Sequence, residues 1–512
     1  MLSLRFRWIF CQLEILRHCL PASVRRILAE LPETLDGTYE RILQEIPKSN
    51  QVHAHRLLQC LTVAARPLRV EELAEVLAVD FGTSEGVPKL NEALRWEDQE
   101  QAVLSACSSL IALIKDEDSR VVQFSHFSVK EFLTSDRLSS SKIDTTRYHH
   151  IRLEPAHTIM AQACLCVLLN LDSDIDEASI ENFPLYQYAA DHFGDHVEFE
   201  DVLSHIRGGV EHLLDADKTH FAAWLRLGGL YLSDEHPYKP QVTPLHYVAR
   251  RGYRGLVDYL ISKRPEDVNF RCEYGTPLHA ALSGEHADVA ELLLGYCMDV
   301  DVRNSLERTP LHLAAACGFV GVTRMLVERK ADINARDSSG KTPLYQAISG
   351  RFEDTALDIA TFLLEHGADV DAENTTRNST ALHYASYTGW VKAAQLMLER
   401  GADIHVRNYR GQTPLHRLVY NLHDSGGDTD HFLDAMRCLL EYGADIDALD
   451  NDHATPLHLT SYSGCFKAAR LLLERGANVH LQDYKGRTPF QVAEAEGWEA
   501  MTELLSEHLH RM

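Results

Sequence analysis

The 512-residue sequence predicts a mainly α-helical fold, in which a solenoid of short helix pairs follows a smaller helical and α+β region. Two observations support this fold class. A variant of the string Thr-Pro-Leu-His occurs eight times in the C-terminal half, and five of the seven intervals are 33 residues. Each copy precedes two short helical segments with one apolar face. Such self-similarity is typical of repeats that stack and bury a continuous core between neighbours.

The N-terminal 237 residues predict three segments in order. Residues 1–48 predict helices over 6–19, 24–31 and 35–46, which Pro32 and Pro47 punctuate. Residues 49–137 predict helices over 53–65, 70–77 and 101–110, then strands over 110–115 and 120–125 joined by an acidic turn. Three helices with a hairpin indicate a small winged-helix-like domain. Residues 145–237 predict a helical connector that docks this domain onto the first repeat.

Residues 238–512 are expected to form eight repeats. Their anchoring threonines are Thr243, Thr276, Thr309, Thr342, Thr380, Thr413, Thr455 and Thr488. Each threonine can cap the first helix, proline fits its first turn, and a glycine such as Gly367 can end the second helix. Repeat one lacks the Gly-Ala signal at 263–266 and repeat three has Glu307 at its turn, so less regular hairpins are expected there. The glutamate-rich last repeat is expected to be a solvent-facing cap.

Residues 309–335 follow the pattern TPLHxA, then glycine, then LLLxxGADxNA almost word for word. The C-terminal half therefore closely resembles the ankyrin repeat family. This resemblance implies an ankyrin-repeat α-solenoid with β-hairpin turns, which binds proteins through its hairpin tips and the concave face of its first helices. It also implies that the repeat histidines hydrogen-bond neighbouring backbone. They are His246, His279, His312, His383, His416 and His458.

The strings LPETLD at 31–36, ARPLRVEELA at 65–74 and FSHFSVKEFL at 124–133 carry a second resemblance. They are similar to the segment that follows the NACHT module in fungal NACHT-ankyrin proteins, which are NLR-like regulators. Residues 1–48 would then be a helical remnant after that module. The same region resembles the winged-helix domain labelled after GPI inositol-deacylase, with no catalytic residue carried over.

The NACHT module carries the phosphate-binding string Gly-x-x-x-x-Gly-Lys-Ser/Thr, which is absent from this sequence. The nearest match, Gly340-Lys341-Thr342, lies in a repeat turn with Ala335 at the position of the first glycine. The chain is expected to be either a shortened relative or part of a longer product with its NTPase module upstream.

Charge and cysteine content limit the classes of partner and compartment. The formal net charge is −25, and residues 50–135 hold eight Lys or Arg against thirteen Asp or Glu, which argues against nucleic acid or an anionic membrane as partner. The 11 cysteines lack a regular spacing, so a reducing compartment, the cytoplasm, is expected. The apolar N-terminal stretch is interrupted by charges and favours an amphipathic helix over an anchor.

No catalytic, cofactor or metal site is predicted. His192 and His196 share a helical spacing that could hold a metal, but no third ligand is placed and solvated or capping histidines are favoured. The repeat histidines could form a metal ladder, yet the structural role implied by the ankyrin resemblance is preferred. Protein partners are therefore expected, without a cofactor, a membrane or a small-molecule substrate.

The candidate partner-binding residues lie in repeats five to eight. Tyr387, Tyr420 and Tyr462 occupy the seventh position after the anchoring threonine, so they would stand side by side on the concave face as binding hot spots. The alternative is that they pack against adjacent repeats or are ordinary surface tyrosines. The adjacent hairpin tips contribute Tyr409, Arg410, Gln412, Asn451, Tyr484, Lys485 and Arg487. The insertion 421–430 predicts a mobile loop, either beside the binding face or simply tolerated.

The sequence thus predicts a non-enzymatic protein-interaction scaffold or sensor in NLR-like signalling. One alternative is the C-terminal part of a larger NACHT NTPase switch. The other is a DNA-associated regulator that uses the winged helix, which the acidic charge disfavours. The partner's identity and the oligomeric state are not encoded in a motif.

Overall fold

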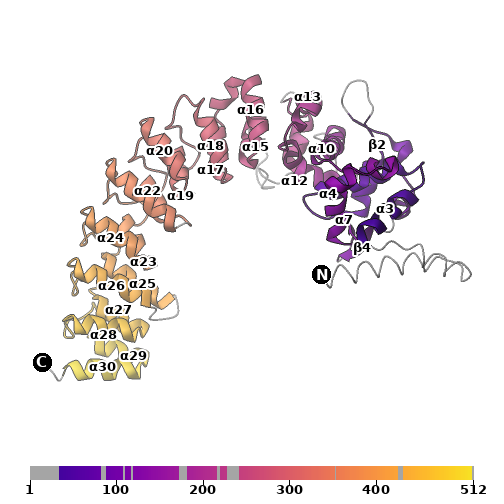
Figure 1. Ribbon diagram of the computed structural model, residues 1–512. Helices are drawn as coiled ribbons and strands as arrows, with labels where there is room; N and C mark the ends of the chain where they lie inside the picture. Colours follow the sequence, from indigo (N-terminus) through magenta and orange to yellow (C-terminus); the bar gives the residue numbers. More distant parts are fainter. Residues whose placement is uncertain are drawn as a thin grey trace, which may run out of the picture. The chain divides into compact units, whose positions relative to one another are not determined.

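The computed structural model describes residues 34–81, 88–107, 110–116, 119–171, 182–215, 219–227, 242–351, 353–424 and 430–509. The chain divides into two compact units, 1–248 with 253–263, and 249–252 with 264–512. Figure 1 shows both units in sequence colours. The helices expected over 6–19 and 24–31 lie outside the described residues, as does the centre of the predicted hairpin turn.

The first unit contains the predicted winged-helix domain. Its helices are α3 (Leu35–Glu45), α4 (Gln51–Val63), α5 (Val70–Leu77) and α6 (Gln99–Cys107). A three-stranded antiparallel sheet has the order β1 (Leu68–Arg69), β5 (Ser119–Phe124) and β4 (Ile111–Asp116), with Leu68 paired to Val122 and Leu113 opposite the same residue. The predicted helices and hairpin are confirmed within a few residues. A second ladder, β2 (Val79–Asp80) with β3 (Lys89–Leu90), was not predicted because strands of two residues leave no alternating pattern.

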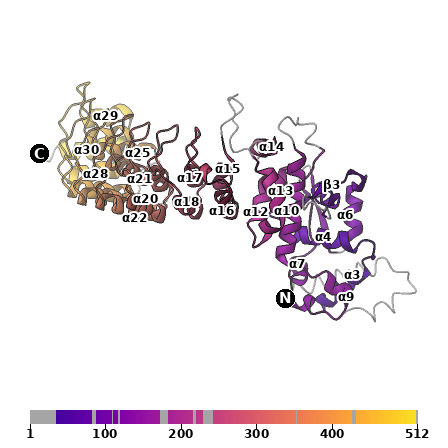
Figure 2. The same ribbon diagram turned by 90° about the horizontal axis from the view of Figure 1, so that it is seen from above.

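A helical layer follows the winged helix. It comprises α7 (Phe127–Leu133), α8 (Asp136–Ser139), α9 (Asp144–Tyr148), α10 (Leu153–Asn170), α12 (Tyr186–Val197), α13 (Val202–Leu213) and α14 (Thr219–Leu227), before the first repeat helices α15 (Pro244–Arg251) and α16 (Arg254–Lys263). Figure 2 shows α10 beside α12 and α13, and α10 also contacts α4. Because α10 packs on several sides, it is apolar around most of its circumference. Among the described residues, no helix is both long and apolar enough to cross a bilayer.

Buried carboxylates join the winged helix to the connector. Glu72 is fully buried and accepts hydrogen bonds from the Arg66 guanidinium at 2.7 Å and 2.9 Å. Glu75 accepts from the backbone N–H of Leu185 at 2.7 Å, in the segment that opens α12. Tyr188 on α12 accepts from the backbone N–H of Ala65 at 3.0 Å. A buried charge is tolerated only with such partners, so these contacts fix one docking geometry.

The connector also holds the first repeat, as the sequence predicts. Trp224 on α14 is fully buried, and its indole N–H donates to the Ala190 carbonyl at 2.9 Å while its ring lies 4.7 Å from that of Tyr247 on α15. Glu198 caps α16 by accepting from the backbone N–H of Gly255 at 2.7 Å and of Leu256 at 3.1 Å. A carboxylate at a helix N-terminus is stabilised by the helix dipole.

The second unit stacks the remaining repeats in two helical layers (Figure 1). The inner layer consists of α17 (Pro277–Ser283), α19 (Pro310–Ala316), α21 (Pro343–Ile348), α23 (Ala381–Thr388), α25 (Pro414–Asp424), α27 (Pro456–Ser463) and α29 (Pro489–Glu496). The outer layer consists of α18 (Ala287–Leu294), α20 (Val320–Glu328), α22 (Glu353–Glu365), α24 (Val391–Glu399), α26 (Asp430–Glu441), α28 (Phe466–Glu474) and α30 (Glu499–Leu509). Each inner helix contacts the next, which buries the alanine and leucine stripes of the repeats.

In repeats two, three, five, six and seven, an imidazole links the repeat to the following hairpin. The His383 ring accepts from the backbone N–H of Thr380 at 3.3 Å through Nδ1, and its Nε2–H donates to the Gln412 carbonyl at 3.0 Å. Gln412 immediately precedes the anchor Thr413 of the next repeat. The equivalent donor and acceptor pairs are His279 and Arg308, His312 and Lys341, His416 and Ala454, and His458 and Arg487. The predicted backbone bonding of these histidines is confirmed.

The two predicted irregularities have different outcomes. Repeat one ends in the 3₁₀ helix Pro265–Asn269, as its missing Gly-Ala signal predicts. Glu307, however, adopts a left-handed φ of 55°, and its N–H donates to the Asn304 carbonyl at 2.9 Å, as Gly340 does to Asp337 at 2.8 Å. The expectation of a less regular hairpin at Glu307 was therefore wrong. The neighbouring hydrogen bonds offset the modest cost of a left-handed non-glycine residue.

Part of the loop that the sequence predicts in repeat six is helical. The sequence predicts a loop over 421–430, but α25 continues to Asp424 and α26 begins at Asp430. Asn421 lies within α25, and its side chain donates to the Tyr387 carbonyl at 2.6 Å. The remainder of the insertion, 425–429, lies outside the described residues.

Replacing His383 with alanine is expected to lower the free energy of unfolding by about 2–4 kcal/mol, because it empties a buried site and leaves the Gln412 carbonyl without its donor. Urea denaturation followed by circular dichroism measures this change. His405→Ala, at an exposed position, is the matched control and should change stability by less than about 0.5 kcal/mol. Equal effects of the two substitutions would contradict a structural role for the imidazole bond.

Stability is also expected to fall as the pH falls from about 6.5 to 4. Burial lowers the pKa of His279, His383 and His416 to about 4, so these rings stay neutral in the folded protein while the unfolded chain protonates near pH 6.5. Their stabilisation is complete above that value and is lost below it, by up to about 1.4 kcal/mol per pH unit for each histidine. Urea midpoints at several pH values test this, and His383→Gln should show a shallower dependence. A midpoint unchanged between pH 7 and 5 would refute it.

Candidate binding surface on the inner helices

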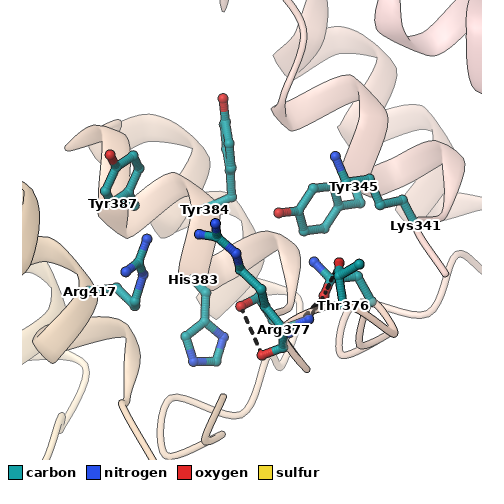
Figure 3. A pocket seen from close by; sticks show the side chains of 10 residues that line it. Lys341, Tyr345, Thr376, Arg377, His383, Tyr384, Tyr387 and Arg417 are labelled. Carbon is teal, nitrogen blue, oxygen red and sulfur yellow. Dashed lines mark hydrogen bonds between the residues drawn. The ribbon is translucent and has the colours of Figure 1, made fainter. Parts of the chain in front are cut away.

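A hollow of about 320 Å³ opens over the inner helices α21, α23 and α25. Figure 3 shows that aromatic and cationic side chains line it. The lining residues are Lys341, Tyr345, Asn374, Thr376, Arg377, Ser379, His383, Tyr384, Tyr387 and Arg417. They come from three successive inner helices and from the hairpin turns of repeats four and five.

A second hollow, of about 220 Å³, adjoins the first and shares Arg377, Tyr387 and Arg417 with it. Its other lining residues are Asn408, Tyr409, Arg410 and Tyr420. Because the two hollows share three side chains, they lie next to each other across repeats four to six. We name the two hollows together the aromatic-cationic groove.

The groove begins where the imidazole ladder is interrupted. Repeat four has Tyr345 at the position that holds histidine in the preceding three repeats and the following three. The Thr342 hydroxyl still accepts from the Tyr345 N–H at 3.3 Å, so the helix cap remains. The phenol ring lies 5.8 Å from the ring of Tyr384 and forms one wall of the first hollow. Burial raises the pKa of Tyr345, so its hydroxyl is a neutral donor near pH 7.

Arg417 occupies the centre of the groove. Its guanidinium carbon lies 4.5 Å from the centroid of the Tyr387 ring and 5.4 Å from that of Tyr420. Burial lowers the pKa of Arg417, and the nearby guanidiniums of Arg377 and Arg410 lower it further, although it remains charged near neutral pH. Two aromatic faces therefore hold a partly desolvated cation in place.

The cations of the groove lack carboxylate partners. Lys341, Arg377, Arg410 and Arg417 form no ion pair with any carboxylate among the described residues, although they lie in a protein of net charge −25. The inner helices α17, α19, α21, α23 and α27 contain no Asp or Glu. The outer helices α22 and α26, in contrast, each contain several Asp or Glu residues.

The structure places four of the ten predicted partner-binding residues in the groove: Tyr387, Tyr420, Tyr409 and Arg410. Tyr420 is 40% exposed and Tyr409 is 50% exposed, so both rings are open to a partner. Tyr462 is 55% exposed but lines neither hollow, and its carbonyl accepts from the Trp498 indole at 3.1 Å.

The other predicted residues lie outside the groove. Gln412 was expected at an accessible tip, but its side chain is buried and interacts with Asn408 at 3.4 Å. Asn451 donates to the Tyr409 carbonyl at 3.0 Å and so links two hairpins. Arg487 forms an ion pair with Asp483 at 2.8 Å. Tyr484 and Lys485 are exposed at the last hairpin.

Sequence reasoning missed the other tyrosine, lysine and arginine residues of the groove, which are Lys341, Tyr345, Arg377, Tyr384 and Arg417. A partial signal for two of them lies at the fourth position after the anchoring threonine. Repeats five and six have Tyr384 and Arg417 there, whereas repeats two, three, seven and eight have Ala280, Leu313, Leu459 and Val492. Repeats one and four, however, have Tyr247 and Gln346 at this position, so it does not mark the altered surface by itself.

No group of three or more His, Cys, Asp or Glu side chains within the described residues could hold a metal ion. His192 bonds Asp195 at 2.9 Å. His196 was expected to be solvated or capping, but it is buried and bonds Tyr188 and His157, each at 2.9 Å. Burial of α12 against α10 was not visible in its sequence, and this packing removes His196 from solvent.

Two protein-family models match the chain, one over the repeats and one over the winged helix. The ankyrin repeat model matches residues 210–304, 297–374, 356–448, 410–483 and 429–511. The chain belongs to the ankyrin repeat family. Residues 39–143 of this ankyrin repeat protein match the winged helix domain of GPI inositol-deacylase, which agrees with the resemblance to a NACHT-associated region.

Among curated relatives, azaphilone pigments biosynthesis cluster protein L of Monascus ruber is 31% identical over 296 residues, which cover 53% of this chain and 61% of that protein. Neurogenic locus notch homolog protein 1 of Danio rerio is 37% identical over 67 residues, 13% of this chain and 3% of that protein. Ankyrin repeat and SOCS box protein 18 of Homo sapiens is 45% identical over 60 residues, 12% of this chain and 13% of that protein. The match thus spans less than two thirds of each relative.

A pair of substitutions separates the buried residue from the accessible one at the sixth hairpin. Gln412→Ala is expected to lower the free energy of unfolding by about 1–2 kcal/mol, because it removes buried side-chain contacts and a partner of Asn408. Arg410→Ala should change it by less than about 0.5 kcal/mol, since its side chain is exposed. Chemical denaturation of both variants tests this, and the reverse order of effects would contradict the placement.

Proposed function

We propose that this ankyrin repeat protein is a non-enzymatic interaction scaffold that binds a protein partner on its concave inner-helix surface, in cytoplasmic NLR-like signalling. The observation that carries the proposal is the aromatic-cationic groove. Tyrosine and arginine are the residue types enriched at binding hot spots, because they offer large contact areas and several donors. Here they gather in one depression over three adjacent repeats. Ankyrin repeats in general mediate protein–protein interactions.

The winged helix and connector support the scaffold role. The Glu75 carboxylate and the Tyr188 hydroxyl lock the connector to the winged helix, while Trp224 and Glu198 lock the first repeat to the connector. Four buried or capped contacts thus make one packed body from the winged helix through α16. The match to a NACHT-associated region is the basis for placing this in NLR-like signalling.

The alternative of a NACHT NTPase switch adds an upstream module to the same scaffold and leaves the role of the groove unchanged. The alternative of a DNA-bound regulator has less support. The third helix of the winged helix, α6, contains Glu100 and no Lys or Arg, and Glu100 pairs with Arg120 of the hairpin. A helix that enters the major groove needs the opposite charge to approach phosphates.

The triple variant Tyr387→Ala, Tyr420→Ala, Tyr462→Ala tests the proposed surface. Protein partners captured by the immobilised chain are quantified by mass spectrometry for the wild type and the variant. Loss of hot-spot tyrosines costs about 2 kcal/mol or more each, so recovery of a genuine partner is expected to fall at least about tenfold. Undiminished recovery would place the binding surface elsewhere.

The matched control removes exposed tyrosines from the other layer. Tyr296 lies two residues after the outer helix α18 and Tyr442 directly follows the outer helix α26, and they are 51% and 42% exposed. The double variant Tyr296→Ala, Tyr442→Ala should capture partners as the wild type does. Circular dichroism of each variant confirms that the repeats remain folded.

A further inference from the structure

We infer that the aromatic-cationic groove recognises an extended acidic segment of a partner protein, with aspartate or glutamate side chains seated against Lys341, Arg377, Arg410 and Arg417. This inference rests on the proposed function and specifies the chemistry of the partner. Three features of the groove lead to it: unpaired positive charge, aromatic support for that charge, and its spread over successive repeats.

Charge complementarity defines the sign of the ligand. Within the described residues the four groove cations have no carboxylate partner, and the inner helices beneath them, α21 and α23, carry no Asp or Glu. Several other arginines of the repeat unit do have a carboxylate partner. Arg308 pairs with Asp337, Arg400 with Glu365 and Arg437 with Asp434. A local excess of cations in an otherwise acidic protein attracts an anionic ligand.

The cations are already positioned for binding. Arg417 lies over Tyr387 and Tyr420, Arg410 lies 5.4 Å from the Tyr409 centroid, and Lys341 lies 5.1 Å from the Tyr345 centroid. An aromatic face restricts a long side chain, so less rotamer entropy is lost when a carboxylate binds. Guanidiniums can form two parallel hydrogen bonds to one carboxylate. The tyrosine rings meanwhile offer apolar contact to the aliphatic part of the same peptide.

The spread of charge favours an extended chain over a compact anion. Lys341, Arg377 and Arg410 belong to the hairpins of repeats four, five and six, and Arg417 lies on the inner helix of repeat six. The shared residues Arg377 and Arg417 connect the two hollows. A single phosphoryl group would engage the cations of one hollow, whereas a peptide with several acidic side chains can engage both.

The test begins with selection of a random, unphosphorylated peptide library displayed on phage against the full chain. Enrichment of peptides rich in Asp and Glu is expected. The best peptide is then labelled, and its affinity is measured by fluorescence polarisation. The double variant Arg377→Gln, Arg417→Gln is expected to weaken binding about a hundredfold or more, because the loss of each charge-assisted hydrogen bond weakens it about tenfold or more. Added salt should weaken binding to the wild type.

The matched control uses arginines that also lie over rings but on outer helices. Arg324 is 4.7 Å from the Phe362 centroid and Arg470 is 4.7 Å from the Phe466 centroid. The double variant Arg324→Gln, Arg470→Gln should bind the acidic peptide as the wild type does. Replacing every Glu and Asp of the peptide with Gln and Asn should abolish binding to all three proteins.

The inference is overturned if the selected peptides are not acidic, if both double variants bind equally, or if binding requires phosphoserine in place of glutamate. The proposed function can survive each of these results. It fails instead if the triple tyrosine variant captures partners as well as the wild type. The two tests therefore separate the existence of the binding surface from the chemistry of its ligand.

Discussion

The hydrogen bond from each repeat histidine to the next hairpin is the interaction on which the repeat unit depends. A single imidazole caps its own helix through Nδ1 and reaches the residue before the following threonine through Nε2, as His383 does at Thr380 and Gln412. Both bonds are buried, so each must remain intact for the repeat to keep its backbone groups satisfied. The bond also sets the register between neighbours, because its acceptor always stands immediately before the next anchor.

The candidate site lies where this ladder is interrupted. Tyr345 keeps the threonine cap but makes no imidazole bond to the next hairpin, and the space there becomes a hollow lined by tyrosine rings. Repeat five again has a histidine at this position, and the His383 ring bonds the next hairpin at Gln412. The hydrogen bonding between repeats is therefore present again after repeat four. A solenoid tolerates such a local change because each repeat contacts only its neighbours. Function can therefore be built into one repeat boundary without altering the rest of the array.

The distribution of charge is also a local property of the chain. The protein is strongly acidic, and some of its carboxylates are paired, as Glu72 is with Arg66 in the first unit. The inner helices α21 and α23 contain no Asp or Glu, and Arg377 and Arg417 have no carboxylate partner within the described residues. The net charge therefore does not indicate what the concave face can bind, because the local arrangement of charge decides which ligand a surface attracts.

Sequence alone determined the repeat architecture, because the Thr-Pro-Leu-His string encodes a cap, a first turn and an inter-repeat donor at a fixed period. It also predicted the three helices and the hairpin of the winged helix from local periodicity, and it placed Tyr387 and Tyr420 on the concave face. Only the tertiary structure decided which side chains meet. Lys341 and Arg417 are 76 positions apart, yet stacking brings them to one hollow, and the same stacking buries Gln412. Accessibility depends on what neighbouring repeats cover, and no local pattern within one repeat records that.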